Sequence, residues 1–325
     1  MKRRTLLAAI PAALAHLALA QSPRRPVIGY LVLQPIHDPP SAERRAFLEG
    51  LREYGDEPGR NVDLVYASAE GQEDFVDDVA RDLVRRKPDV IVASGAIAVL
   101  AASRATTTIP VVIMAVGDPV GIGVVRSLAR PERNVTGVSF ISSDLAGKRL
   151  QLMAELLPTA KRVAVLWDKR NANAREETKV TTAAIRRLGL ADVPLPVGAE
   201  AEVAQALERI RTLRADALYV AFEGGIVANT RTAIADHCLR QRVPLVSGWS
   251  SLTDAGGLLS YAPDIPAIFR RSAWYAHRIL KGASPGELPI EQASTVELVI
   301  NLKTASALGI VIPQSLLLRA DRVIQ

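Results

Sequence analysis

Short apolar runs alternate with amphipathic segments along almost the whole chain. The runs are rich in valine and isoleucine, as in Val90–Ala93 and Pro110–Ala115, and each is followed by a stretch whose apolar residues recur every three or four positions. The first pattern is typical of buried strands, and the second of helices that cover a sheet. Because parallel strands need a crossover between them, the alternation predicts an α/β protein with parallel sheets.

The first half of the chain contains one complete series of such elements. The apolar runs predict strands at residues 27–32, 61–66, 90–93, 110–115 and 135–140. The helical patterns predict helices at residues 41–54 and 73–86, and one that begins at Ser94-Gly95 and ends near residue 104. A further helix is expected to begin at Asp118-Pro119, because aspartate is a good N-cap and proline is favoured at the first helical position.

The second half repeats this order of elements. Helices are expected at residues 144–157, 174–188, 226–241 and 266–281, and strands at residues 162–167, 217–222, 243–246 and 258–261. Two halves of this kind predict two similar lobes, each a sheet covered by helices. We expect one lobe to comprise residues 26–140 and 264–281, and the other residues 145–258 and 293–325. Crossovers between the lobes are expected near residues 140–144, 259–263 and 284–295.

The first twenty residues have a different pattern. A basic start at Lys2–Arg4 precedes an apolar run at Leu6–Leu19, and Ala18–Ala20 offers small residues to a signal peptidase. The run is shorter than the roughly 20 residues that span a bilayer, so residues 1–20 are predicted to be a secretory signal peptide. A buried N-terminal helix is the alternative, but Pro11 interrupts the run. We expect export to the periplasm, by either the general or the twin-arginine route.

Removal of this segment lowers the charge of the chain. The full sequence has a formal net charge of +6, and three of its basic residues lie in the first twenty, which leaves about +3. The remaining arginines and lysines are interleaved with acidic residues, as on solvated helix faces. We therefore expect no nucleic-acid partner.

Cys238 is the single cysteine of the sequence. It has no second cysteine with which to form an intramolecular disulfide, and no cysteine follows the predicted cleavage site to carry a lipid anchor. We expect Cys238 to be a small buried residue of the helix at 226–241, with a reactive thiol as the alternative.

No catalytic or metal-binding motif is recognisable in the exported part of the sequence. Its histidines, His37, His237 and His277, lie far apart and lack metal-ligand spacing. The nucleophile elbow, the zinc-protease motif and the phosphate-binding loop are missing. Gly121-Ile122-Gly123 resembles the start of a dinucleotide-binding motif, but Arg126 stands where the third glycine belongs. We expect a protein that is not an enzyme and that uses no cofactor and no metal.

Four stretches of the chain resemble a known family. They are residues 118–128 (DPVGIGVVRSL), 131–139 (PERNVTGVS), 257–263 (GLLSYAP) and 297–310 (ELVINLKTASALGI), the last continuing to residues 315–321. Together they resemble the substrate-binding proteins of ABC importers, in the group whose better-known members take up tryptophan and tyrosine. The resemblance implies the type I periplasmic-binding-protein fold, with two Rossmann-like lobes, a three-segment hinge and a ligand in the cleft between the lobes.

The resemblance also implies a partner, the membrane permease of an ABC importer, and we expect the binding protein itself to be a monomer. A sensory role, in which the bound state is passed to a membrane receptor, is the alternative that the sequence leaves open. A transcription regulator of the same fold would begin with a helix-turn-helix, whereas this chain begins with the predicted signal peptide and enters a strand at Val27.

Aromatic residues gather at the carboxyl ends of the predicted strands, where open parallel sheets bind ligands. The candidates for stacking on a ligand are Tyr30, Trp167, Phe222, Trp249 and Tyr261. Tyr66 and Phe140 occupy similar positions. The alternative role for all of these side chains is packing at the strand ends or in the hinge.

Polar candidates lie at the turns that follow strands. Ser94-Gly95 offers a hydroxyl and free backbone N–H groups to a carboxylate or phosphate. Asp118 and Glu223 are placed to receive an ammonium group, although Asp118 also suits a cap. Asn171 and Asn173 resemble the asparagine that follows this strand in family members. These residues predict a small carboxylate-bearing ligand with a flat or apolar part, an amino acid being the leading candidate.

Overall fold

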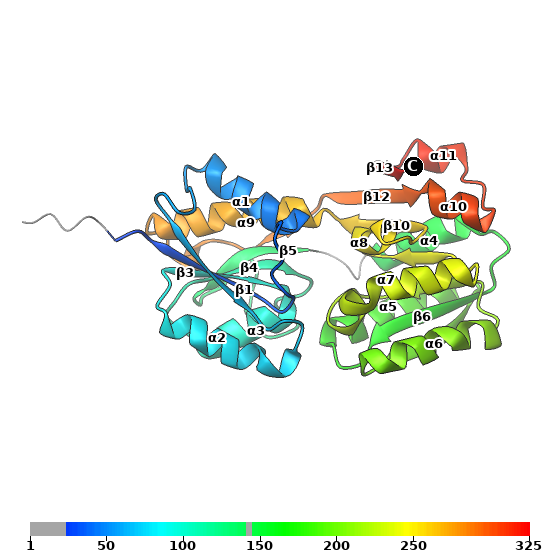
Figure 1. The fold of residues 1–325 in the computed structure, drawn as a ribbon, viewed down its shortest axis with the longest axis horizontal. Coiled ribbons are helices and arrows are strands. Elements are labelled where there is room, and N and C mark those ends of the chain that lie inside the picture. Colours follow the sequence, from blue (N-terminus) through cyan, green and yellow to red (C-terminus); the bar gives the residue numbers. More distant parts are fainter. Residues whose placement is uncertain (1–23, 141–144) are drawn as a thin grey trace, which may run out of the picture.

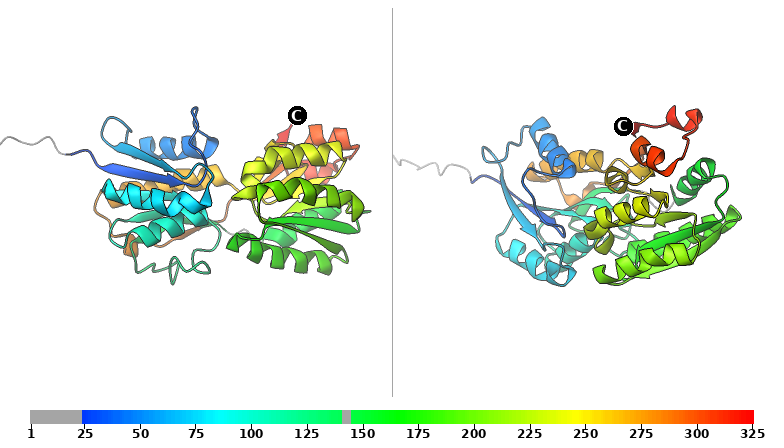
Figure 2. Two further views of the ribbon diagram at one scale, coloured as in Figure 1. Left: turned by 60° about the horizontal axis from the view of Figure 1, so that its bottom comes forward. Right: turned by 45° about the vertical axis from the view of Figure 1, so that its right-hand side comes forward.

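The computed structural model describes residues 24–140 and 145–325 and shows an α/β protein of two lobes. The lobes lie side by side in Figure 1, and two further views show the same division (Figure 2). The predicted fold class is therefore confirmed. The signal peptide predicted at residues 1–20, and residues 141–144 of the first expected crossover, lie outside the described residues. In the described part of the chain, no helix combines the length and the apolar character needed to cross a membrane.

The first lobe, in the described part of the chain, is built on a six-stranded parallel sheet with the order β11-β5-β4-β3-β1-β2. Its strands are β1 (Val27–Val32), β2 (Asp63–Ser68), β3 (Val90–Ser94), β4 (Val111–Val116), β5 (Val135–Phe140) and β11 (Glu291–Ala293). Helices α1 (Ala42–Glu53) and α9 (Ile265–Leu280) cover one face. The other face is covered by α2 (Val76–Arg85), which follows the 3-10 helix η1 (Glu73–Phe75), and by α3 (Gly95–Ala105). The 3-10 helix η3 (Pro285–Glu287) leads into β11.

Both faces of this sheet are buried, which explains the continuous apolar runs in the sequence. Val90 and Val112 belong to the core on the side of α1 and α9, whereas their neighbours Ile91 and Ile113 belong to the core on the side of α2 and α3. Side chains that follow each other along a strand point to opposite faces, so a strand covered on both sides needs apolar residues at every position.

The second lobe has, among the residues that the structure describes, a seven-stranded sheet with the order β13-β12-β10-β9-β8-β6-β7. Its strands are β6 (Arg162–Asp168), β7 (Ala191–Val197), β8 (Ala217–Val220), β9 (Leu245–Ser247), β10 (Leu259–Pro263), β12 (Val296–Asn301) and β13 (Arg322–Ile324). Helices α4 (Ala146–Leu156) and α5 (Ala172–Arg187) pack on one face, together with α10 (Leu302–Leu308) and α11 (Gln314–Leu317). Helices α6 (Glu200–Thr212), α7 (Ile226–Arg240) and α8 (Ser250–Asp254) pack on the other. The pairing of β10 with β12 is antiparallel.

The two described links between the lobes follow β10 and β11. Strand β10 belongs to the second sheet and the next helix, α9, to the first lobe, so the chain crosses at Asp264. Strand β11 belongs to the first sheet and β12 to the second, so the chain crosses back at residues 294–295. Residues 259–263, where the sequence placed a crossover, instead form an internal strand that pairs with both β9 and β12.

The helix predicted to begin at Asp118-Pro119 is absent, and this prediction was wrong. Residues 118–125 form turns in which Asp118 Oδ1 accepts a hydrogen bond from the Gly121 N–H at 2.8 Å. Two glycines within this short stretch disfavour a helix, and Gly123 has a φ of +77°, outside the helical region. Asp118 is a cap, as one of the two interpretations predicts, but it caps a turn.

Cys238 is buried in α7, with 2% of its surface exposed, as predicted. Burial raises the pKa of its thiol to about 12. Because the thiolate is the reactive form of cysteine, this thiol is inert at neutral pH.

Candidate ligand-binding site between the lobes

A cavity of about 1130 Å³ lies between the two lobes. The first lobe contributes the loop after β1, the turn after β3 and the beginnings of α1 and α9. The second lobe contributes the loops after β6, β8 and β9. These loops follow strands that run parallel to their neighbours, and they stand at the carboxyl ends of those strands, where such sheets bind ligands. A small organic ligand fits in a cavity of this size.

The cavity brings together six of the predicted ligand contacts and leaves out four. The lining residues among them are Tyr30, Ser94, Gly95, Phe222, Glu223 and Trp249. Trp167 and Tyr261 pack instead against the core under α4 and α5. Asp118 lies on its exposed turn, outside the cavity lining. Asn171 lines the cavity and Asn173 does not; the side chain of Asn171 also caps α5 by accepting from the Asn173 and Ala174 N–H groups.

An aromatic group spans the two lobes at this cavity. The Trp249 ring lies 5.4 Å from the Phe140 ring of the first lobe and 5.2 Å from the Phe222 ring of the second, both edge to face. Ser247 fixes the backbone of this tryptophan, because its hydroxyl donates to the Trp249 carbonyl at 2.8 Å and accepts from the Trp249 N–H at 3.1 Å. Trp249 and Phe222 therefore form a positioned wall against which a flat ligand can pack.

The turn after β3 leaves backbone donors free at the start of α3. Ser94 is the N-cap residue, but its hydroxyl makes no capping hydrogen bond. Gly95 has a φ of +78°, which favours glycine, and the space next to its Cα is open. The first N–H groups of a helix have no partner within the helix and attract anions. This turn is therefore able to hold a carboxylate.

Glu223 is buried in the cavity wall of the second lobe. One of its oxygens lies 3.2 Å from Arg231 Nε, and the other accepts a hydrogen bond from the Ser251 hydroxyl. Burial raises the pKa of the Glu223 carboxyl, while Arg231 and Ser251 act in the opposite direction. The carboxylate thus has a counter-charge within the protein and still faces the cavity.

Several lining residues were missed by the sequence analysis. They come from the loop after β1 (Gln34–His37), the first turn of α1 (Arg44), the start of α9 (Asp264, Ile265, Pro266 and Phe269) and the β12–β13 pair (Glu297 and Arg322). The first of these segments could have been predicted, because it follows the carboxyl end of β1 and ligands bind at the carboxyl ends of parallel strands. The others reach the cavity through the packing of α1 on α9 and through the late strands, neither of which a local pattern reveals.

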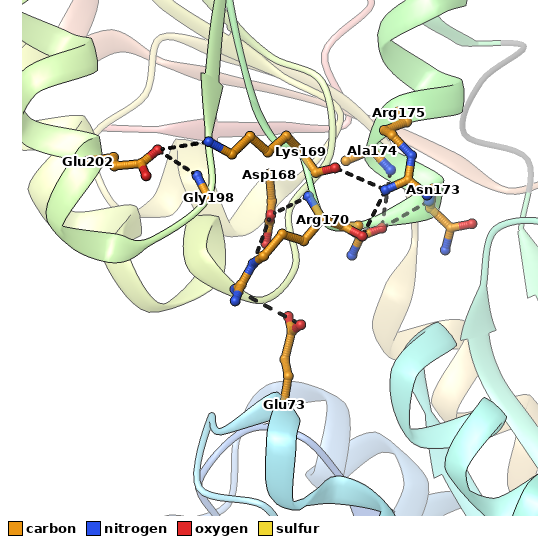
Figure 3. A network of polar contacts seen from close by, with 10 residues as sticks. Glu73, Asp168, Lys169, Arg170, Asn173, Ala174, Arg175, Gly198 and Glu202 are labelled. Carbon is orange, nitrogen blue, oxygen red and sulfur yellow. Dashed lines mark hydrogen bonds and ion pairs between the residues drawn. The ribbon is translucent and has the colours of Figure 1, made fainter.

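A polar contact joins the lobes beside the cavity (Figure 3). Glu73, from η1 of the first lobe, points toward the loop after β6, where its Oε2 lies 4.0 Å from Arg170 Nη2. Arg170 Nε lies 3.5 Å from Asp168 Oδ1. The other oxygens of the two carboxylates, Glu73 Oε1 and Asp168 Oδ2, are buried without a hydrogen-bond partner among the described residues, and both lie within 3.3 Å of the position that a Cβ on Gly225 would take.

This contact makes the observed arrangement of the two lobes sensitive to the charge of Glu73. Burial raises the pKa of the Glu73 carboxyl, Arg170 lowers it, and Asp168 and Asp74 raise it. A carboxyl whose pKa is raised where the two lobes meet favours this arrangement below its ordinary pKa, near 4.3, and that contribution is lost as the pH rises through the raised value. Ligand affinity of the wild type is therefore expected to increase as the pH falls.

Replacing Glu73 with glutamine is expected to strengthen ligand binding at pH 7 by about two- to fivefold, corresponding to at most about 1 kcal/mol for a partly exposed charge. The same change should flatten the pH dependence of the dissociation constant, which isothermal titration at several pH values measures. Asp74→Asn, on the same turn, is the matched control: Asp74 is the weakest of the named influences on the pKa of Glu73, so its effect on binding should be much smaller. Weaker binding by Glu73→Gln would show that attraction to Arg170 outweighs repulsion from Asp168.

Comparison with known proteins identifies relatives of this chain. The family model described as ABC transporter substrate binding protein matches residues 31–324. A tyrosine-binding protein of Clostridioides difficile (strain R20291) is 26% identical over 266 residues, which cover 82% of this chain and 76% of the relative.

Two solved structures are similar over most of the chain. A conserved domain protein of Vibrio cholerae O1 biovar El Tor has a TM-score of 0.86 and 30% identity, covering 92% of this chain and 100% of that one. An ABC domain of Streptococcus pneumoniae in complex with L-Trp has a TM-score of 0.85 and 26% identity, with the same coverage. The chain is thus similar to a protein named as tyrosine-binding and to a domain solved with L-Trp, and its two lobes have the type I periplasmic-binding-protein fold. The predicted resemblance is confirmed.

Proposed function

Because the chain belongs to the family of ABC transporter substrate-binding proteins, we propose that it captures a small amino acid or aromatic ligand and passes it to the membrane permease of an ABC importer. We propose further that it works in the periplasm as a monomer, after removal of residues 1–20. Its ligand is bound and released unchanged, without a cofactor or a metal.

The observation that carries this proposal is the aromatic wall at the junction of the lobes. Trp249 and Phe222 belong to the second lobe, and Trp249 also contacts Phe140 of the first. Because Tyr30 and Ser94 of the first lobe line the same cavity, a ligand that packs on this wall lies between the two lobes. A ligand that contacts both lobes stabilises the closed form by its binding free energy. The names of the relatives, tyrosine-binding protein and a complex with L-Trp, support an aromatic amino acid as the ligand class.

The polar groups of the cavity suit the two charges of an amino acid. The free N–H groups at Gly95 and the hydroxyl of Ser94 would hold the carboxylate. Glu223, on the other lobe, would receive the ammonium group. Tyr30 closes the cavity on the side of β1. An ammonium and a carboxylate bound by different lobes would again couple binding to closure.

Replacing Trp249 with alanine is expected to weaken binding of the aromatic ligand at least about tenfold, because truncating a buried aromatic side chain at the centre of an interface costs about 2 kcal/mol or more. Isothermal titration on the folded variant measures the loss. Trp167→Ala is the matched control, since Trp167 is also half-buried beside the second-lobe core but does not line the cavity. Equal losses of affinity in the two variants would place the ligand elsewhere.

A further inference from the structure

Arg44 is a buried arginine in the wall of the cavity. It stands in the first turn of α1, with 9% of its surface exposed, and lines the cavity from the side of the first lobe. Its guanidinium donates from Nη2 to the carbonyl of His37, and its Cζ lies 5.5 Å from the centre of the Tyr66 ring. The loop after β1 and the aromatic ring of β2 therefore fix the position of this side chain.

Arg44 differs from the other arginines at this cavity in having no carboxylate as a partner among the described residues. Arg231 pairs with Glu223 at 3.2 Å, and Arg322 pairs with Asp254 at 2.6 Å and Glu297 at 2.9 Å. Among residues 24–140 and 145–325, no carboxylate forms an ion pair with Arg44, and its contacts are the His37 carbonyl and the Tyr66 ring. A guanidinium carries five N–H donors, so most of its hydrogen-bonding capacity is left for a ligand.

A buried cation that lacks an anionic partner is costly, and a ligand that supplies the anion removes that cost. The planar guanidinium fork matches a carboxylate, which it binds through two parallel charge-assisted hydrogen bonds. Strand β1, whose loop leads to Arg44, pairs with β3, whose turn carries Gly95, so both donors stand at the same edge of the first sheet. The donors of Arg44 and of the turn at Gly95 therefore both line the first-lobe side of the cavity.

We propose that Arg44 binds the carboxylate of the ligand and sets the preference of this protein for amino acids over amines that lack a carboxylate. The proposal rests on the proposed function and adds the residue that recognises one end of the ligand. The aromatic wall of Phe222 and Trp249 holds the ring, and Glu223 of the second lobe faces the ammonium group. Arg44 and Glu223 therefore discriminate between zwitterions and ligands with a single charge.

The test uses two pairs of probes, tyrosine with tyramine and tryptophan with tryptamine, which differ only in the carboxylate. Isothermal titration of the mature wild-type chain should show tighter binding of the amino acid in at least one pair. Arg44→Gln should weaken binding of that amino acid about 10- to 100-fold and leave binding of its amine nearly unchanged, because a hydrogen bond to a charged group contributes about 1.5–3 kcal/mol. Arg45→Gln, an exposed neighbour, should change neither affinity.

Arg44→Lys covers the case in which Arg44→Gln does not fold. Lysine retains the charge but loses the two-pronged geometry, so it should weaken binding of the amino acid several-fold while binding of the amine is retained. Equal losses for amino acid and amine, or no loss for either, would overturn the role of Arg44. A wild type that binds none of the four probes would overturn the proposed ligand class itself, and this outcome is distinct from the first.

Discussion

Replacing Arg149 with methionine is expected to lower the free energy of unfolding by about 3–5 kcal/mol, the usual cost of removing one partner of a buried ion pair. Arg149 of α4 is fully buried, its Nη1 lies 2.7 Å from Glu177 Oε1, and its Nε donates to the Tyr261 carbonyl at 2.7 Å. The guanidinium also fills the space beside Gly248, where a Cβ would come within 2.4 Å of its Cζ. Urea denaturation followed by circular dichroism measures the change.

The paired variant Arg149→Met with Glu177→Leu is the control for this prediction. Replacing both charges of a buried pair with apolar residues of similar size often recovers stability, because neither charge has then to be desolvated. We expect the double variant to be more stable than Arg149→Met alone. If Arg149→Met unfolds at the wild-type midpoint, the buried pair contributes nothing to the stability of the second lobe.

Replacing Gly137 with alanine is expected to destabilise the first lobe by about 3 kcal/mol or more. Gly137 lies in β5 with a φ of +132°, a region that side chains with a Cβ essentially do not adopt. A Cβ at this position would also lie 2.4 Å from the carbonyl oxygen and 2.6 Å from the nitrogen of Ile113, its partner on β4. Neither backbone atom can move without breaking the sheet.

Gly123→Ala is the matched control for Gly137. Its φ of +77° is also positive, but a Cβ there would meet nothing within 4 Å. The loss should be about 1 kcal/mol, the cost of a left-handed backbone alone. Thermal or urea unfolding of both variants measures the difference, and equal losses would show that contact with Ile113 carries no cost.

The strands were predicted best where both faces of a sheet are covered. Residues 27–32 and 135–140 form β1 and β5 with the predicted bounds. Strand β7 was missed because Pro194 and Pro196 interrupt its pattern, and the structure tolerates them because β7 is an edge strand of the second sheet. Helix α6 was missed with it. The helix expected after Asp118 does not form, because Gly121 and Gly123 disfavour it more than the N-cap at Asp118 favours it.

The candidate site was predicted from strand ends, and this rule finds the edge of a sheet but not the face. Phe222 and Trp249 follow their strands and turn toward the other lobe, whereas Trp167 and Tyr261 lie within β6 and β10 and point into the second-lobe core. A side chain within a strand points to one of two faces, and the period alone does not say which face meets the ligand. Arg44 was missed because only its burial sets it apart from the many exposed arginines, and the sequence does not reveal that burial.

The most direct test of ligand capture is titration of the mature, ligand-stripped chain with amino acids, aromatic carboxylates and neutral sugars, followed by mass spectrometry of the bound molecule. The account predicts that an aromatic amino acid binds more tightly than the corresponding carboxylate or amine, with Trp249→Ala weakening that binding, and that it is recovered unchanged. Tight binding of a neutral sugar in place of any amino acid, or chemical conversion of the bound ligand, would contradict it.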